Sequence, residues 1–162
     1  MIICGIDPGV AIVGFGFIEK DGVKHKSLRH GVIRTPSDLS LEKRLLQIRG
    51  DLCQLFDMYE PRVLAVEELF FNTNVTTGIN VAHARGVILL TAAERGIPVF
   101  SYSPQQVKQA VVGYGKAEKQ QVMEMTRVLL NLPRVPRPDD AADALAVALC
   151  HSQASHSILK QL

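Results

Sequence analysis

Hydrophobic and polar positions alternate along the first part of the chain, as they do in half-buried β-strands. An apolar run over residues 1–6 ends at Asp7, and a Pro-Gly turn follows at once. Over 12–18 large apolar residues alternate with glycines, and the Asp-Gly pair at 21–22 is a strong hairpin signal. The pattern therefore predicts three antiparallel strands, the third of which ends near Thr35.

The apolar spacing then changes from two to about 3.6 residues, which is typical of amphipathic helices. It predicts a helix over 41–59, stopped by Pro61, and then a short buried strand over 63–66 that leads into Glu67. A second helix is predicted over about 77–95, and its apolar positions cover more than one face. A sheet does not bury all of them, so a partner chain or another helix of the same chain must cover the remainder.

The last part of the chain alternates strand and helix signals. A fifth short strand is predicted over 99–100, and helices are predicted from 103–104 onward, over 118–130 and from Asp139. The stiff, basic, proline-rich segment 133–138 separates the last two helices. The chain contains no internal repeat, linker or low-complexity segment.

Together these elements predict an α/β fold with a five-stranded mixed sheet, three antiparallel strands followed by two parallel ones, flanked by helices. The first strand is expected at the centre, with the fourth parallel beside it. We expect a single domain over 1–153 and a short, flexible C-terminal tail over 154–162.

Composition narrows the class of protein. Of the 162 residues, 47% are hydrophobic and 21% are charged, which is close to a globular average and excludes a disordered chain. The apolar runs are too short to span a membrane, and no signal-peptide pattern precedes the first strand, so we expect a cytoplasmic protein without membrane association. Cys4, Cys53 and Cys150 are odd in number and far apart, so reduced core residues are expected rather than disulfides or a zinc site.

The net charge of +2 is unevenly distributed. Basic residues outnumber acidic ones in two stretches, 24–49 and 105–137. If the fold brings both stretches onto one face, they can bind a polyanion; otherwise they are a solvated surface.

Acidic residues stand where the predicted elements end. Because neighbouring parallel strands have their carboxyl ends at the same edge of a sheet, Asp7 is expected near Glu67. Asp140 and Asp143 are three residues apart, so they project from one face of the last helix. Turn formation at Asp7 and helix capping in the last helix are the structural alternatives.

Four gathered carboxylates repel one another and persist as anions only if cations neutralise them. Mg²⁺ prefers oxygen ligands and keeps water in its shell, so such a site accepts phosphate oxygens. Two ions about 4 Å apart activate a water molecule and stabilise the leaving oxygen of a phosphodiester. The spacing therefore favours metal-dependent hydrolysis of a nucleic-acid backbone, with scattered structural acids as the alternative.

Six segments together resemble the RuvC family of Holliday junction resolvases, in order and in spacing, over nearly the whole chain. They are Gly5-Ile6-Asp7-Pro8-Gly9, Val66-Glu67-Glu68-Leu69-Phe70, Ala84-Arg85-Gly86, Gln106-Val107-Lys108-Gln109, Ala117-Glu118-Lys119 and Asp140-Ala141-Ala142-Asp143-Ala144-Leu145-Ala146. The resemblance implies an RNase H-like fold and a structure-selective endonuclease that makes paired, symmetric nicks in four-way DNA junctions during homologous recombination and DNA repair. It also implies a homodimer and a partner RuvA–RuvB branch-migration complex. The helix at about 77–95 is the expected dimer interface.

The resemblance also assigns roles to single positions. The family's catalytic, metal-binding acids correspond to Asp7, Glu67, Asp140 and Asp143. Its DNA-contacting positions correspond to Phe70, Lys108 and Lys119, of which the aromatic ring is expected to stack on bases. The expected cofactor is Mg²⁺, for which Mn²⁺ can substitute, with two ions in each active site. Asp139 lies outside the register of the motif and is expected either to cap the helix or to support a residue of the site.

Three other functions fit parts of the pattern. An RNase H-like nuclease acting on RNA needs no fixed dimer. The segment 5–9 also resembles the phosphate loop of the sugar kinase and actin superfamily, which needs two lobes that 162 residues do not accommodate. A DNA-binding module without catalysis leaves the four placed acids unexplained. His83 and His151 are candidates for a general base, although a lone histidine on an apolar helix is more often structural.

Overall fold

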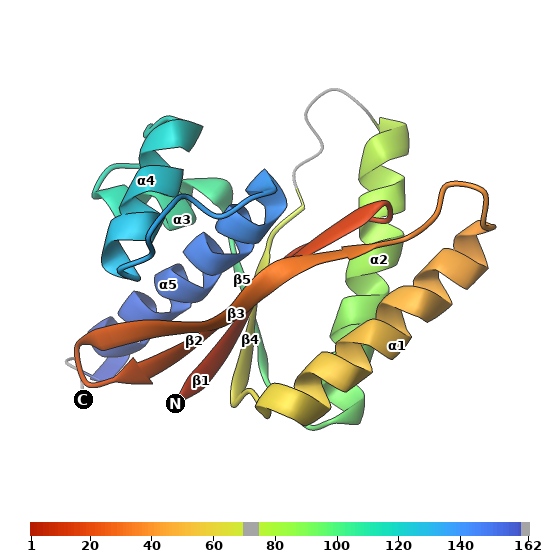
Figure 1. Ribbon diagram of the computed structural model, residues 1–162, viewed down its shortest axis with the longest axis horizontal. Coiled ribbons are helices and arrows are strands. Elements are labelled where there is room, and N and C mark those ends of the chain that lie inside the picture. The colour runs from red at the N-terminus through yellow and green to blue at the C-terminus, as the bar shows by residue number, and fades with distance from the viewer. Residues whose placement is uncertain (70–74, 160–162) are drawn as a thin grey trace.

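The computed structural model describes residues 1–69 and 75–159, which form a mixed sheet between two layers of helices (Figure 1). The strands are β1 (Ile2–Asp7), β2 (Ile12–Asp21), β3 (Lys24–Arg34), β4 (Val63–Glu67) and β5 (Val99–Tyr102). They lie in the order β3-β2-β1-β4-β5. β1 pairs antiparallel with β2 and parallel with β4, and β5 is parallel to β4. The sheet predicted from the sequence, with the first strand at its centre, is confirmed.

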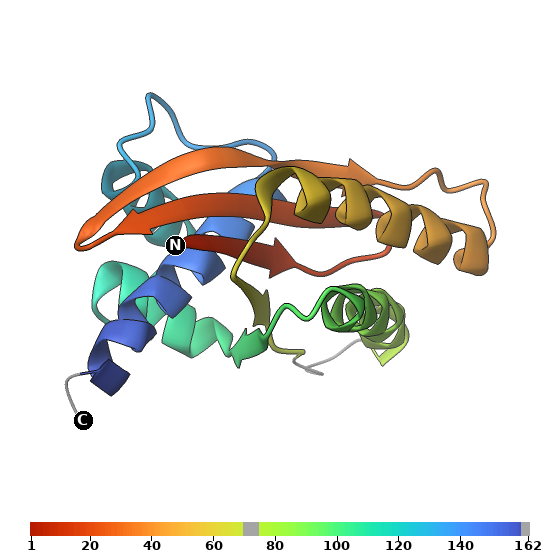
Figure 2. The same cartoon turned by 90° about the horizontal axis from the view of Figure 1, so that it is seen from below.

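The helices lie on both faces of this sheet (Figure 2). They are α1 (Leu41–Tyr59), α2 (Val75–Glu94), α3 (Pro104–Val112), α4 (Lys119–Leu129) and α5 (Asp139–Leu159). α1 and α2 cover one face, and α5 crosses the other with α3 and α4 packed on it. Residues 154–159, expected from the sequence to belong to a tail, are the last part of α5.

Local sequence signals explain where several helices begin and end. Ser103 and Gln106 form a reciprocal capping box at the start of α3, which satisfies two backbone N–H groups that the helix leaves unpaired. α1 ends at Glu60, whose left-handed backbone conformation (φ 46°) precedes Pro61. The ends of these two helices are therefore determined locally.

The layer of α1 and α2 packs on the sheet through large side chains. Phe17 is fully buried there and stacks on Tyr59 of α1 with ring centroids 4.5 Å apart. Ile48, Leu52 and Ile88 are also fully buried in this core. Burial of this apolar area stabilises the fold at about 25 cal/mol per Å².

The layer of α5 also packs through large side chains, since Ile3, Leu145 and Leu149 are fully buried there, but in addition the helix lies directly on strand backbone. A Cβ atom added at Gly5 would lie 2.0 Å from the carbonyl oxygen of Ala144, and one added at Gly14 would lie 2.0 Å from that of Asp140. Ala144 and Ala148 are themselves fully buried. Glycines in β1 and β2 therefore let α5 approach the sheet closely.

All three cysteines are free thiols. Cys4 and Cys150 are buried, as expected, but Cys53 is partly exposed on α1. Among residues 1–69 and 75–159, no helix is both long and apolar enough to cross a membrane.

Candidate active site

Asp7 and Glu67 lie on the face of the sheet that α5 covers. Successive side chains of a strand point to opposite faces, and Ile3 in β1 and Ala65 in β4 belong to the core under α5. Asp7 lies four residues after Ile3 and Glu67 lies two residues after Ala65, so both acids point to the same face as these core residues. Ile6 is paired with Val66, so the two carboxylates are neighbours at the carboxyl ends of parallel strands. The neighbourhood predicted from strand order is confirmed.

The first turns of α5 bring the other two acids to the same place. Asp7 is paired with Gly14 of β2, and the bare backbone of Gly14 lies directly against Asp140. Asp143 follows one turn later on the same helix. A side chain at position 14 would push this end of the helix away, so the glycine positions the acids as well as the helix.

The electrostatics of Asp7 show that the four acids act on one another. The pKa of Asp7 is raised to about 8; burial is the largest cause, and the carboxylates of Glu67, Asp143 and Asp140 also contribute to the increase. The ammonium group of Lys119 opposes this increase. Three elements far apart in sequence thus place four acids in one electrostatic cluster.

Glu67 and Asp143 are shifted in the same direction. Burial is the largest cause that raises the pKa of each, and the negative charge of Asp143 adds to the effect at Glu67. Lys119 lowers both, and Lys108 also lowers that of Glu67. Ionising the whole cluster therefore requires more positive charge than two lysines supply.

Lys119 bridges two aspartates of α5. Its Nζ lies 3.1 Å from Asp143 Oδ2 and 3.6 Å from Asp139 Oδ2. Asp139 also accepts a hydrogen bond from Arg137. Of the two roles expected for Asp139, these contacts fit support of a site residue, because Asp139 links Lys119 to the basic segment before α5.

Two cavities with different linings border the acids. One of about 230 Å³ is lined by Glu67 and Asp143 together with Lys108 and Lys119. The other, of about 510 Å³, is lined by Asp140, the turn after β1, and residues of α1 and α2 that include Arg44. Both predicted lysines thus lie beside the acids.

The donor set fits a hard divalent cation in chemistry, because all four candidate ligands offer carboxylate oxygens. The pKa values of Asp7, Glu67 and Asp143 are raised, chiefly by burial and also by repulsion from neighbouring carboxylates, which a cation relieves. Within residues 1–69 and 75–159, no three His, Cys, Asp or Glu side chains stand close enough together to form a metal-binding group. Repulsion keeps carboxylates apart, and Asp143 is held by Lys119.

The sequence pattern did not identify Arg44 or Thr35 as residues of the site. Arg44 lies three residues after Leu41 and four before Ile48, so it interrupts the apolar stripe of α1. A charged residue on such a stripe indicates a specific partner or a cavity. The charged position on the apolar stripe can be read from the sequence, but the sequence does not show that the cavity also borders Asp140.

The remaining candidates lie elsewhere. Phe70, expected to contact DNA, is outside the described residues. His151 is bonded through Nδ1 to the Tyr102 hydroxyl at 2.7 Å and packs against Phe100, and it follows Asp143 by more than two helical turns. His83 is exposed on α2. Neither histidine lines the two cavities beside the acids.

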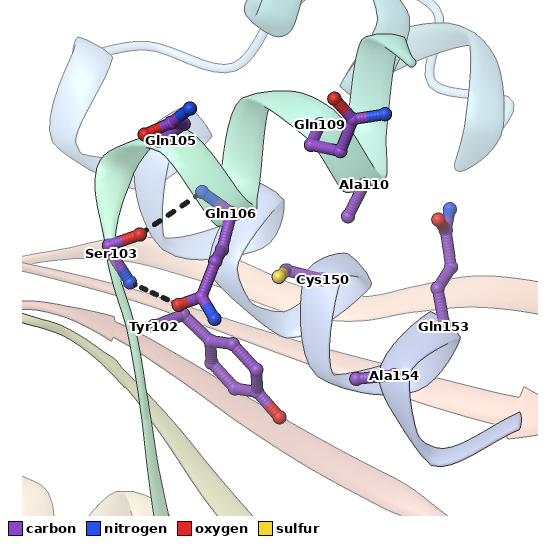
Figure 3. Close-up of a pocket in the computed structure, with 9 residues that line it drawn as sticks. All are labelled: Tyr102, Ser103, Gln105, Gln106, Gln109, Ala110, Cys150, Gln153 and Ala154. Atoms are coloured by element: carbon purple, nitrogen blue, oxygen red, sulfur yellow. Dashed lines mark hydrogen bonds between the residues drawn. The ribbon is translucent and has the colours of Figure 1, made fainter. Parts of the chain in front are cut away.

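A third cavity, of about 480 Å³, lies between α3 and the C-terminal half of α5 (Figure 3). Its lining contains the side chains of Tyr102, Cys150 and several glutamines. Burial raises the pKa of Cys150 to about 11, so its thiol is protonated at neutral pH. The lining holds no carboxylate or lysine, and the cavity does not belong to the acidic site.

The fold and the site together define a class of protein. A five-stranded sheet of this order, with acids at the carboxyl ends of its central parallel strands and on a helix packed across them, is an RNase H-like nuclease architecture. Comparison with known proteins identifies the group within this class. Residues 3–151 match the family model described as "Crossover junction endodeoxyribonuclease RuvC".

Individual relatives agree with the family match. A crossover junction endodeoxyribonuclease RuvC of Heliobacterium modesticaldum is 58% identical over 150 residues, which cover 93% of each chain. One of Alkaliphilus metalliredigens is 53% identical over 156 residues, covering 96% of this chain and 95% of the relative. The structure of Thermus thermophilus RuvC in complex with a Holliday junction substrate superposes with a TM-score of 0.92 at 37% identity, covering 97% and 96% of the two chains. The chain belongs to the RuvC family of endodeoxyribonucleases, which confirms the resemblance read from its motifs.

Proposed function

We infer that this protein resolves four-way DNA junctions by paired, symmetric nicks during homologous recombination and DNA repair. The observation that carries this function is the convergence of Asp7, Glu67, Asp140 and Asp143 beside two lysines. The Thermus thermophilus relative bound to a Holliday junction supports the choice of substrate. Hydrolysis of RNA is less well supported, because the relatives compared above are endodeoxyribonucleases.

The four acids are the proposed ligands of Mg²⁺, with Mn²⁺ as a substitute and two ions in each site. Bound divalent ions activate water and stabilise the leaving 3′ oxygen of a phosphodiester. The raised pKa of Asp7 supports this assignment, because a buried carboxylate among other acids gains most from a neutralising cation. Asp143 pairs with Lys119 through Oδ2, so its Oδ1 would be the oxygen offered to a cation.

Lys108 and Lys119 have a proposed role in holding the DNA backbone. Both line the smaller cavity beside Glu67 and Asp143, and an ammonium group is a compact charge for a phosphate oxygen. The side chain of Lys119 is 55% exposed, so its ammonium group is accessible to a phosphate of the substrate. Phe70 remains the proposed stacking residue.

A synthetic four-way junction tests this function directly. We expect wild-type protein to make paired nicks with Mg²⁺ or Mn²⁺ and none with chelator, while Asp7→Asn abolishes cleavage and keeps junction binding. Asp21→Asn is the matched control, because Asp21 is exposed at the opposite end of β2 from the strand pair of Asp7. Full cleavage by Asp7→Asn, or cleavage of linear duplex at the same rate, would refute the assignment.

The proposed homodimer uses the outer face of α2. Ile79 and Leu90 on this face are 48% and 56% exposed, and the Gly86 between them leaves open space beside the helix. A four-way junction has two-fold symmetry, so a two-fold dimer can present one site to each of two like strands. Ile88 is fully buried and Val87 packs against the same core, so these two apolar residues of α2 stabilise the fold and do not belong to the proposed interface.

Leu90→Glu tests this interface without touching the core. We expect it to convert the dimer to a monomer in sedimentation experiments and to replace paired nicks by single ones. Val128→Glu introduces the same charge at an equally exposed position of α4 and should leave the dimer intact. A dimer unchanged by Leu90→Glu would mean that another surface pairs the subunits.

Two further assignments follow from the substrate. A RuvA–RuvB branch-migration complex is the proposed partner, because the family resolves junctions that such a motor moves. Chromosomal DNA as substrate places the protein in the cytoplasm. Co-purification of the protein with RuvA–RuvB on a junction, and its loss without the junction, is the expected result.

A further inference from the structure

We propose that the larger cavity beside Asp140 binds the nucleotide that flanks the scissile phosphodiester, and that Arg44 binds its phosphate. This inference rests on the proposed function, because it takes a DNA strand as the substrate. It adds a binding residue on α1, an element to which neither the acids nor the candidate lysines belong.

The position of the cavity fits a neighbouring nucleotide. Its volume of about 510 Å³ lies within the range of roughly 300–1,000 Å³ typical of ligand sites. Asp140 forms part of its wall, whereas Glu67 and Asp143 line the smaller cavity on the lysine side. Nucleotides next to a scissile phosphate at the acids can therefore extend into the cavity beside Asp140.

The guanidinium group of Arg44 is fixed in place before any ligand binds. Its Nε donates to Thr35 Oγ1 at 2.7 Å, and its Nη2 lies 3.4 Å from the Thr35 carbonyl oxygen. Thr35 is buried, and its hydroxyl donates in turn to the Val10 carbonyl at 2.6 Å. Because one edge of the guanidinium is held in this way, little side-chain entropy remains to be lost on binding.

The positive charge of Arg44 is not neutralised by a carboxylate. Arg49, Arg95 and Arg127, also on or at the ends of helices, form ion pairs with Glu94, Asp57 and Glu124. In the part of the chain that the structure describes, Arg44 forms no ion pair, although Asp140 lines the same cavity. A held cation without a counter-ion at a cavity wall favours an anionic ligand, and its planar fork matches phosphate.

A purely structural role for Arg44, tying α1 to the end of β3 through Thr35, is the alternative to be tested. Arg44→Gln removes the charge and retains hydrogen-bonding groups. Lys43→Gln is the matched control, because Lys43 is the adjacent, exposed residue of the same helix and loses the same charge. Arg44→Lys keeps the charge but loses the planar guanidinium group. Thermal unfolding of each variant measures how much the hydrogen bonds between Arg44 and Thr35 contribute to stability.

Junction binding is measured by fluorescence anisotropy with chelator, so that no cleavage occurs. We expect Arg44→Gln to bind about tenfold more weakly, the loss of one charge-assisted hydrogen-bonded contact, with Arg44→Lys between it and wild type. The slope of log affinity against log salt should fall by about one for Arg44→Gln and by less for Lys43→Gln. Wild-type affinity and slope in Arg44→Gln would overturn the proposal.

Replacing single phosphates of the DNA by a neutral group identifies the phosphate that Arg44 contacts. A neutral methylphosphonate is placed at each position flanking the cut, one at a time, and binding of wild type and Arg44→Gln is compared. At one flanking position we expect neutralisation to weaken wild type about tenfold and to leave Arg44→Gln unchanged, since the contact is already lost. Equal losses in both proteins at every position would overturn the proposal, as would an Arg44→Lys variant indistinguishable from wild type if Arg44→Gln does not fold.

Different results would refute junction resolution and the Arg44 site. Wild-type protein that neither binds nor cuts a four-way junction refutes the proposed function, and the Arg44 site with it. Wild-type protein that cuts the junction, combined with a methylphosphonate scan that does not distinguish Arg44→Gln, refutes the Arg44 site alone.

Discussion

The two faces of the central sheet are packed by different means. Under α1 and α2, large side chains such as Phe17 and Leu52 interlock in a fully buried core. Under α5, Gly5 and Gly14 expose bare backbone on which the helix lies directly. Both arrangements bury apolar area, because Ile3 and Leu145 are fully buried under α5 as well. The close approach of α5 also brings acids from strands and helix within range of one another, so the α5 face contributes both stability and the geometry of the site.

The largest expected loss of stability comes from the α1 and α2 face. Phe17→Ala removes a fully buried ring stacked on Tyr59 and should cost about 3–5 kcal/mol of unfolding free energy. The acids on the other face keep their positions, so protein that remains folded should cleave at the wild-type rate. Urea unfolding and cleavage at low temperature measure the two effects. A large fall in the cleavage rate of folded protein would show that the faces are not separable.

On the α5 face a smaller loss of stability should accompany a larger loss of activity. Gly14→Ala places a methyl group against the Asp140 carbonyl and should cost about 1–3 kcal/mol by overpacking, while moving the first turn of α5 away from Asp7. Gly50→Ala in α1, where a Cβ meets open space, is the control and should stabilise by about 0.5–1 kcal/mol. Unfolding and cleavage assays on both variants test the comparison. Unimpaired cleavage by Gly14→Ala would contradict it.

The acids on the α5 face should make the free energy of unfolding fall with rising pH when divalent ions are removed. Folded Asp7 keeps its proton up to about pH 8, whereas the unfolded chain releases it near 3.8, so unfolding releases a proton between these values. Stability therefore falls with rising pH through this window, by at most about 1.4 kcal/mol per unit from this group, and levels off above it. Glu67 and Asp143 change stability in the same direction.

Urea unfolding between pH 7 and 8 in chelator measures this slope, because free histidines are mostly neutral there. Asp7→Asn should flatten it, and added Mg²⁺ should reverse it by neutralising the ionised cluster. A slope that Asp7→Asn leaves unchanged would show that Asp7 is not the group responsible.

The smallest change in stability is expected at two exposed ion pairs, one on each face. Lys119→Ala and Arg49→Ala each break a pair of partly exposed side chains and should cost about 0.2–1 kcal/mol. Only Lys119 lies beside the acids, so only Lys119→Ala should reduce junction cleavage and the salt dependence of binding. Thermal unfolding and cleavage at several salt concentrations distinguish the two. Equal activity in both variants would remove Lys119 from the site.

Much of the site was predictable because its residues obey local rules. Asp7 ends an apolar run, Glu67 ends the next parallel strand, and the spacing of Asp140 and Asp143 places them on one helix face. Strand order then followed from the rules that limit connections between elements. Lys119 was found by resemblance to a family motif, and its contacts with two aspartates are a result of the structure.

Other features had no local signal of sufficient strength. Helix spacing predicted where α5 begins, but not that it continues to Leu159. The apolar residues of α2 predicted an exposed face without separating buried Ile88 from exposed Leu90, because that depends on how α1 packs beside it. The Arg44–Thr35 contact joins residues of a helix and a strand end that no spacing rule connects.

The sequence by itself determined the order of strands and helices, the acids at their ends and the family to which the chain belongs, because periodicity, turn residues and motif spacing are properties of neighbouring positions. Only the tertiary structure decided how closely α5 lies on Gly14, how strongly Asp7 interacts with the other acids, and that Arg44 lines a cavity beside Asp140. These depend on distances between segments far apart in the chain, which packing in three dimensions sets.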